Sequence, residues 1–177
     1  MNVFVVGSGR CGTMTFSRAC SHITNFTSGH ETSPGRMYFP DNHIEVDSHL
    51  CWYLPLVVDR YPEAYWVHLQ RRNLWMNVRS FIGRPGTKLY SGFAYMNKLS
   101  DRAAATLLVR NANRLVEKLI PDAHKIYIEE PKTEFARFWD AIGAVGDLTA
   151  ALLEFDVKYN ATPRGHNRLK KVGYNRE

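Results

Sequence analysis

Short runs of β-branched and aromatic residues alternate along the chain with segments whose apolar residues recur at helical spacing. Strands are predicted at 3–6, 25–28, 44–46, 65–69 and 125–128, and helices at 13–22, 47–60, 74–82, 100–120 and 133–142. Strands that alternate with helices pair in parallel through right-handed crossovers. The sequence therefore predicts one α/β domain over residues 1–177, with three α/β/α layers around a central parallel sheet.

Local signals refine the expected boundaries. Asp47 or Ser48 can cap the helix that follows, and Pro55 inside it predicts a kink or a late start. Ser100 is the expected cap of the longest helix. Two polar stretches that contain glycine and proline are expected to be loops, at 31–42 and 83–95.

The composition is that of a globular protein. With 45% hydrophobic and 23% charged residues, the chain is neither a disordered segment nor a collagen-like or coiled-coil protein. The net charge of +6 is concentrated in blocks without acidic residues, at 1–30, 64–100 and 161–176. Three such blocks can surround one anionic ligand or form separate solvated faces. The last block is a basic C-terminal tail that begins at about residue 164.

Cysteine usage and hydropathy indicate a compartment. Three cysteines without metal-type spacing predict neither a disulfide framework nor a metal site. The chain opens directly on a strand pattern rather than on a signal peptide, and no apolar run has membrane-spanning length. We therefore expect a cytoplasmic protein without a metal or a membrane partner.

A glycine-rich segment separates the first predicted strand from the first predicted helix. Glycines at such a place let successive backbone amides form a concave nest, where the helix dipole favours a phosphate or a sulfate. Arg10 adds charge, and the hydroxyls of Thr13 and Thr15 add donors. The alternative is a tight turn without a ligand. The segment consists of Gly7, Ser8, Gly9, Arg10, Cys11, Gly12, Thr13, Met14 and Thr15.

Two common nucleotide motifs do not fit this segment. In the loop of nucleoside-triphosphate enzymes the second glycine precedes a lysine, whereas Thr13 follows Gly12 here. The glycine spacing fits the dinucleotide fingerprint, but the acidic residues nearest the expected offset, Asp41 and Glu45, are badly placed.

The segment instead resembles the 5′-phosphosulfate loop of sulfotransferases that use 3′-phosphoadenosine-5′-phosphosulfate (PAPS), with Cys11 where serine is commoner. A second motif supports the resemblance: Arg72 ends a predicted strand and Ser80 lies eight residues later, like the 3′-phosphate site of that family. Leu74 stands where the family usually has proline. Weaker similarity, at 126–130 and 138–143, extends the resemblance over most of the chain.

The resemblance implies a P-loop nucleotide-binding fold and sulfuryl transfer from PAPS to a hydroxyl or amine, leaving adenosine 3′,5′-bisphosphate. The glycine-rich segment would hold the phosphosulfate, with Arg10 stabilising the leaving group, and Arg72 and Ser80 would hold the 3′-phosphate. Because attack needs a base opposite the loop, Glu31 is the first candidate and His30 the second. The acceptor is a small molecule or a glycan, and a second copy of the chain in a homodimer can complete its site.

Other interpretations stay open at this stage. Asp47, Ser48 and His49 follow a strand and either line the same sheet edge or serve as a helix cap. A phosphotransferase that lacks the usual lysine is the second hypothesis, and a non-catalytic binder of nucleotide or RNA phosphates is the third. The modest net charge does not favour nucleic acid as the partner.

Overall fold

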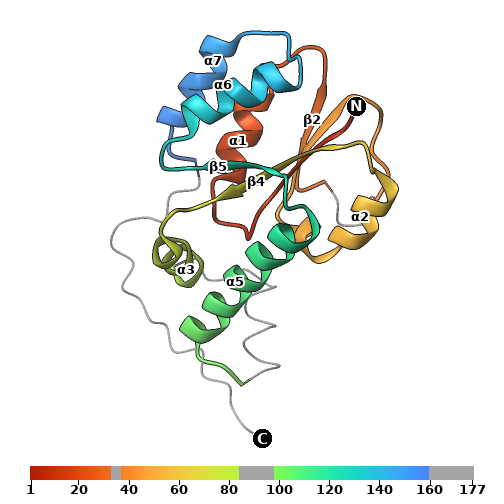
Figure 1. Ribbon diagram of the computed structural model, residues 1–177. Coiled ribbons are helices and arrows are strands. Elements are labelled where there is room, and N and C mark those ends of the chain that lie inside the picture. Colours follow the sequence, from red (N-terminus) through yellow and green to blue (C-terminus); the bar gives the residue numbers. More distant parts are fainter. Residues whose placement is uncertain (33–36, 84–97, 160–177) are drawn as a thin grey trace, which may run out of the picture.

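The computed structural model describes residues 1–32, 37–83 and 98–159 of the chain. Five parallel strands form one sheet in the order β2-β3-β1-β4-β5 (Figure 1). Helices flank both faces, which confirms the predicted three-layer α/β/α arrangement. The strands are β1 (Val3–Val6), β2 (Thr27–His30), β3 (His43–Val46), β4 (Tyr65–Gln70) and β5 (His124–Tyr127).

The helices divide between the two faces of the sheet. α1, α6 and α7 cover one face, and α2 and α5 cover the other, with α3 packed against α5 (Figure 1). None of the helices described is long and apolar enough to cross a membrane. They are α1 (Thr13–Cys20), α2 (Leu54–Arg60), α3 (Leu74–Ile82), α5 (Asp101–Leu119), α6 (Pro131–Ala141) and α7 (Leu148–Leu153), with 3-10 helices η1 (His49–Trp52) and η2 (Glu154–Asp156).

The apolar run of β1 follows from its central place. Val3 and Val5 pack on the α1 side of the sheet, whereas Phe4 and Val6 pack on the α5 side, and all four are fully buried. A strand covered on both faces has no solvent side and therefore no polar alternation. β1 pairs with β3 on one edge and with β4 on the other.

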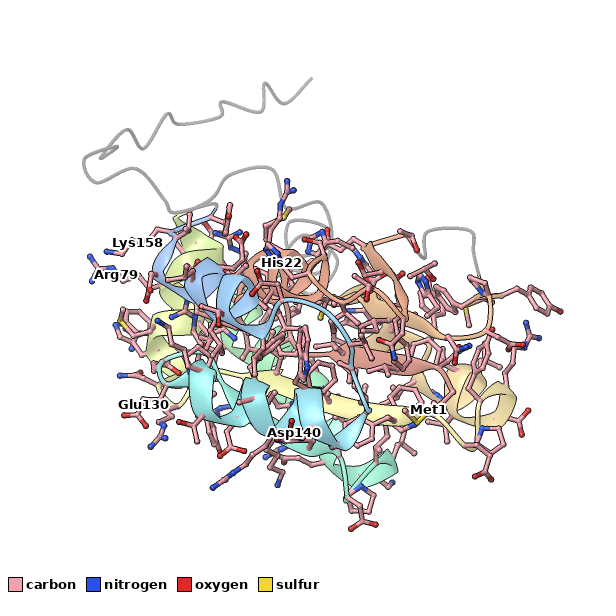
Figure 2. The ribbon with its side chains drawn as sticks, turned by 90° about the horizontal axis from the view of Figure 1, so that it is seen from above. Met1, His22, Arg79, Glu130, Asp140 and Lys158 are labelled. Atoms are coloured by element: carbon pink, nitrogen blue, oxygen red, sulfur yellow. The ribbon has the colours of Figure 1, made fainter. Side chains whose placement is uncertain are left out.

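This strand order creates a topological switch point at the end of β1. The chain leaves β1 through α1 toward β2 on one side, and it later crosses through α2 to β4 on the other side. Doubly wound sheets bind ligands in the crevice where the order reverses, at the carboxyl ends of the strands. Figure 2 shows that Arg79 and Glu130 lie at this end of the molecule, opposite Met1.

The predicted strands and helices are found, but several boundaries differ; the strand predicted at 25–28, for example, is Thr27–His30. The helix predicted over 47–60 is divided into η1 and α2, with Tyr53 between them at φ −114° and Pro55 in the first turn of α2. Ser100 caps α5 as predicted, because its hydroxyl accepts from the Ala103 amide. α7, which the sequence did not predict, is capped by Asp147. Most of the loop predicted at 83–95 and the basic tail lie outside the described residues.

An aromatic cluster joins α1 to α6 beneath the sheet. Phe16, Phe135 and Phe138 are fully buried, with ring centroids 5.1 Å apart for Phe16 and Phe135 and 5.5 Å apart for Phe135 and Phe138. The cluster contributes to stability through apolar burial and ring contacts.

Replacing one ring of this cluster by alanine tests the fold. Phe135→Ala removes a buried ring and leaves a cavity, so we expect the free energy of unfolding to fall by about 3–5 kcal/mol. Leu153→Ala is the control on the same layer, because Leu153 is 59% exposed. Urea denaturation measures both variants. Equal losses would contradict the placement of Phe135 in the core.

Candidate functional site

The candidate site is built on the glycine loop (residues 7–12), which connects β1 to α1 at the switch point. Gly9, Arg10 and Gly12 all have positive φ, at 78°, 56° and 98°. Where left-handed residues stand next to residues of ordinary conformation, successive backbone N–H groups can form a concave nest that binds anions. Glycine adopts this conformation at little cost, whereas for Arg10 it is strained.

Two glycines of the loop are also required by packing. A Cβ at Gly7 would lie 2.3 Å from the carbonyl oxygen of Leu69, and a Cβ at Gly12 would lie 2.4 Å from Cγ1 of Ile128. These contacts press the loop against the ends of β4 and β5. Packing alone accounts for these two glycines. A ligand is therefore indicated only by the donors and charges around the loop.

The first turn of α1 favours an anion. Gly12 is its N-cap, and no acidic residue stands in the first turn of this helix, which lies wholly within the described residues. The first amides of a helix have no intrahelical acceptor and carry the positive end of the dipole. Negative charge is therefore favoured where the glycine loop enters α1.

Several groups around the buried Cys11 thiol favour negative charge there. Burial raises the pKa of Cys11 to about 11, while the amides of Gly9 and Cys11 and the guanidinium groups of Arg71 and Arg10 all act to lower it. These groups lower the pKa because each stabilises negative charge on the sulfur. Of these groups, the guanidiniums of Arg10 and Arg71 carry full positive charges, which would also attract a phosphate or sulfate at the loop.

The structure brings one residue of each predicted phosphate motif together. Nε of Arg10, in the glycine loop, donates to Oγ of Ser80, on α3, at 3.2 Å, although the two residues are 70 positions apart. Arg71 also reaches the loop, because its Nε donates to the carbonyl oxygen of Arg10 at 3.0 Å. No role was predicted for Arg71, and only its place beside Arg72 directly after β4 could have suggested one.

Arg72 points toward β5 in this structure. Its Nη2 lies 2.8 Å from Oε2 of Glu130, and its guanidinium lies 5.0 Å from the centre of the Tyr127 ring. It contributes to an open hollow of about 450 Å³ whose lining also includes Lys125 and Thr133. The predicted role of Arg72 at a 3′-phosphate therefore stays a prediction, and an anion there would have to replace Glu130.

Glu31 is linked to the glycine loop by the hydroxyl group of Ser48. It follows β2 at φ 52°, and its Oε1 accepts from Oγ of Ser48 at 3.1 Å. Ser48 in turn approaches the loop, since a Cβ at Gly9 would lie 3.4 Å from its Oγ. His30, the second candidate base, ends β2, and its Nε2 is buried without a hydrogen-bond partner among the residues described.

A buried carboxylate that the sequence analysis did not use anchors the turn at Glu31. Glu45 is fully buried, and its carboxylate accepts from the amide of Thr32 at 2.8 Å and from its hydroxyl at 2.7 Å. The same carboxylate lies 3.0 Å from Nε2 of His43. Glu45 therefore fixes the residue next to Glu31. Only the polar residues alternating along β3 could have indicated this network.

Asp47 and His49 form an acid–imidazole pair at the end of β3. Oδ1 of Asp47, which is fully buried, lies 2.9 Å from Nδ1 of His49 and accepts from the His49 amide at 2.7 Å. The hydrogen bond to Asp47 raises the pKa of His49, burial lowers it less, and the charges of Asp47 and Glu31 add to the increase. Asp47 thus holds the start of η1 through the His49 amide, whereas Ser48, the N-cap of η1, makes no side-chain cap hydrogen bond. A role of these residues at the acceptor site stays a prediction.

Comparisons with protein-family models, with curated proteins and with solved structures found no match. Among residues 1–32, 37–83 and 98–159, no group of three or more His, Cys, Asp or Glu side chains is placed to hold a metal ion.

The Asp47–His49 pair can be tested by titration of its imidazole. In an NMR titration of the histidines, we expect His49 to titrate above its ordinary pKa and His68, whose pKa is lowered by burial, to titrate below it. Asp47→Asn should lower the pKa of His49 and leave that of His68 unchanged. If His49 titrates normally in the native protein, the pair does not exist in solution.

The raised pKa also fixes the direction of the pH dependence. A group whose pKa is higher in the folded state contributes its full stabilisation below the unfolded value, about 6.5 for histidine. This contribution disappears as the pH rises through the folded-state pKa of His49. Urea unfolding across this range should therefore show a stability loss with rising pH that Asp47→Asn reduces.

Proposed function

We propose that this protein transfers a sulfuryl group from PAPS to a hydroxyl or amine acceptor. The observation that carries the proposal is the hydrogen bond between Arg10 and Ser80, which joins the two motifs that resemble the donor site of sulfotransferases. Both motifs lie at the carboxyl ends of β1 and β4, beside the switch point where such sheets bind ligands.

The glycine loop would hold the phosphosulfate end of the donor. Its support is the first turn of α1 together with the amides and guanidinium groups that favour negative charge at Cys11. As the bond from sulfur to the bridging oxygen breaks, charge grows on the 5′-phosphate that leaves. Donors already oriented toward that charge lower the barrier, and removing one typically costs about 3–4 kcal/mol.

Ser80 and Arg72 would hold the 3′-phosphate. Arg72 is paired with Glu130 in this structure, but their side chains are 58% and 74% exposed. An exposed ion pair contributes only about 0–1 kcal/mol. A phosphate monoester offers up to two charges and several acceptor oxygens, so it can replace Glu130 as the partner of Arg72.

The acceptor side would be completed by Glu31. The acceptor oxygen or nitrogen forms a bond to sulfur, the bridging S–O bond breaks with its electron pair on the phosphate, and the acceptor proton passes to the Glu31 carboxylate. His30 is the second candidate for the proton. The imidazole of His49 lies on the same edge, and the field of Glu31 acts on it. The acceptor is a small molecule or a glycan.

Ligand-dependent thermal stability tests the donor. A ligand that binds only the native state raises the melting temperature. We expect adenosine 3′,5′-bisphosphate to stabilise the protein and ATP with magnesium to have a much smaller effect, because the loop lacks the lysine of nucleoside-triphosphate sites. Thermal-shift measurements with both nucleotides at equal concentrations give the comparison.

Two outcomes would favour a different function. Stabilisation by ATP with magnesium, without any by the bisphosphate, would favour a phosphotransferase. Binding to RNA that weakens steeply with salt, with no effect of either nucleotide, would favour a non-catalytic binder of nucleic-acid phosphates.

Arg10 is the residue on which the transfer step should depend most. Arg10→Ala removes one charged donor, so we expect the rate of transfer to fall about 100- to 1000-fold while the fold is retained. The measurement is transfer of ³⁵S from labelled PAPS to a panel of phenols, amines and glycans. Arg110→Ala, an equal change of charge at an exposed position of α5, is the control. Unchanged transfer by Arg10→Ala would refute the assignment.

A further inference from the structure

A buried amide on α3 contacts the glycine loop at three points. Asn77 is 2% exposed and lies one turn before Ser80 on the same helix. Its side-chain amide lies 2.7 Å from Oγ of Ser8, 3.1 Å from the carbonyl oxygen of Gly9 and 3.2 Å from that of Arg10. An asparagine in the interior of a helix is unfavourable unless its side chain is well satisfied.

The surroundings decide which way the amide is turned. The carbonyl oxygens of Gly9 and Arg10 can only accept, so the amide nitrogen of Asn77 must face them, and its oxygen then accepts from the Ser8 hydroxyl. The carbonyl of Arg10 has a second donor in Nε of Arg71 at 3.0 Å. Donors from α3 and from the end of β4 therefore converge on the carbonyl groups of the loop.

This arrangement fixes the direction of the loop amides. In a trans peptide the C=O and the following N–H point in opposite directions, and none of the described peptide bonds is cis. With the carbonyls of Gly9 and Arg10 turned toward Asn77, the N–H groups of Arg10 and Cys11 point away from α3. The direction of these amides decides whether the loop attracts or repels an anion.

We propose that Asn77 is a positioning residue for anion binding by the glycine loop, which it keeps in the form whose amides can bind a 5′-phosphate. The inference rests on the proposed function for the identity of the ligand. Asn77 touches neither donor nor acceptor in this scheme and acts only through the backbone of Gly9 and Arg10. Its loss should weaken binding of the 5′-phosphate and spare the 3′-phosphate.

The test separates the two phosphates of one ligand. Calorimetry gives the affinities of adenosine 3′,5′-bisphosphate and adenosine 3′-monophosphate, and their ratio measures what the 5′-phosphate contributes. For Asn77→Ala we expect this ratio to fall about tenfold or more, because the loop loses three hydrogen bonds, two of which hold the carbonyl groups of Gly9 and Arg10. The affinity for the 3′-monophosphate should change by less than about twofold.

Asn113→Ala is the matched control. Asn113 lies on α5, and its Oδ1 is 3.3 Å from Nε2 of the buried His68, with no hydrogen bond to the loop among those of the described residues. We expect this variant to lower the melting temperature without changing the affinity ratio. If Asn77→Ala also lowers only the melting temperature, Asn77 is a structural residue and the proposal is overturned.

Further variants keep the test decisive if Asn77→Ala does not fold. Asn77→Asp retains an acceptor for Ser8 but sets carboxylate oxygen against two carbonyls, so the ratio should fall further. Arg71→Lys, at a position 27% exposed, keeps the charge and removes the planar donor to Arg10, and it should lower the ratio selectively. An unchanged ratio in every folded variant would overturn the proposal.

A failure of the proposed function can be told apart from a failure of this inference. If the native protein binds neither adenosine phosphate, the sulfotransferase proposal fails, and inorganic pyrophosphate becomes the probe of the loop. Loss of pyrophosphate binding in Asn77→Ala, with binding retained in Asn113→Ala, would still support the positioning role. Absence of pyrophosphate binding to the native protein would overturn it.

Discussion

The backbone between β1 and α1 must turn within six residues, and it does so through three residues at positive φ. At Arg10 this conformation is strained, at a cost of about 1–3 kcal/mol, and persists only where the surroundings hold it. Here Arg71 and Asn77 both donate to the carbonyl of Arg10. The strained residue is also the one whose guanidinium reaches Ser80. The structure thus concentrates strain at the point where the candidate chemistry is located.

The architecture could be predicted because the chain carries its signals locally. Apolar strand patterns alternate with helical ones, and Pro55 marks the break between η1 and α2. The glycine loop was identified for the same reason, since its glycines stand between a strand and a helix. α7 was missed because it is one short helix of six residues, too brief for periodicity to show.

The contacts of the site could not be predicted in the same way. Asn77 and Glu45 are polar residues at buried positions, and nothing in their neighbours' sequence says which groups satisfy them. The direction of Arg72 depends on the pairing of β4 with β5, which brings it to Glu130. Such contacts follow from tertiary packing, whereas the spacing of Arg72 and Ser80 shows only that a site can form.

Two arginines at the end of β4 are matched by two carboxylates after β5. Nη1 of Arg71 lies 3.8 Å from Glu129, and Arg72 is paired with Glu130. These carboxylates compete with any bound anion, so a ligand with a single charge gains little by replacing them. In the proposed function, a ligand with phosphate groups at both ends would engage the glycine loop and Arg72 together, and the second contact would form at high effective concentration. Under that proposal, the competition would favour a doubly phosphorylated ligand.

Glu31, the proposed base, and the Asp47–His49 pair lie on the same sheet edge as the glycine loop. Asp47 makes the His49 imidazole more basic, so His49 carries positive charge up to a higher pH than an ordinary histidine. Ser48 stands between this pair and the loop, and its hydroxyl donates to Glu31. A polyanionic donor bound in the loop would raise the pKa of His49 further, because an imidazolium loses its proton less readily beside negative charge.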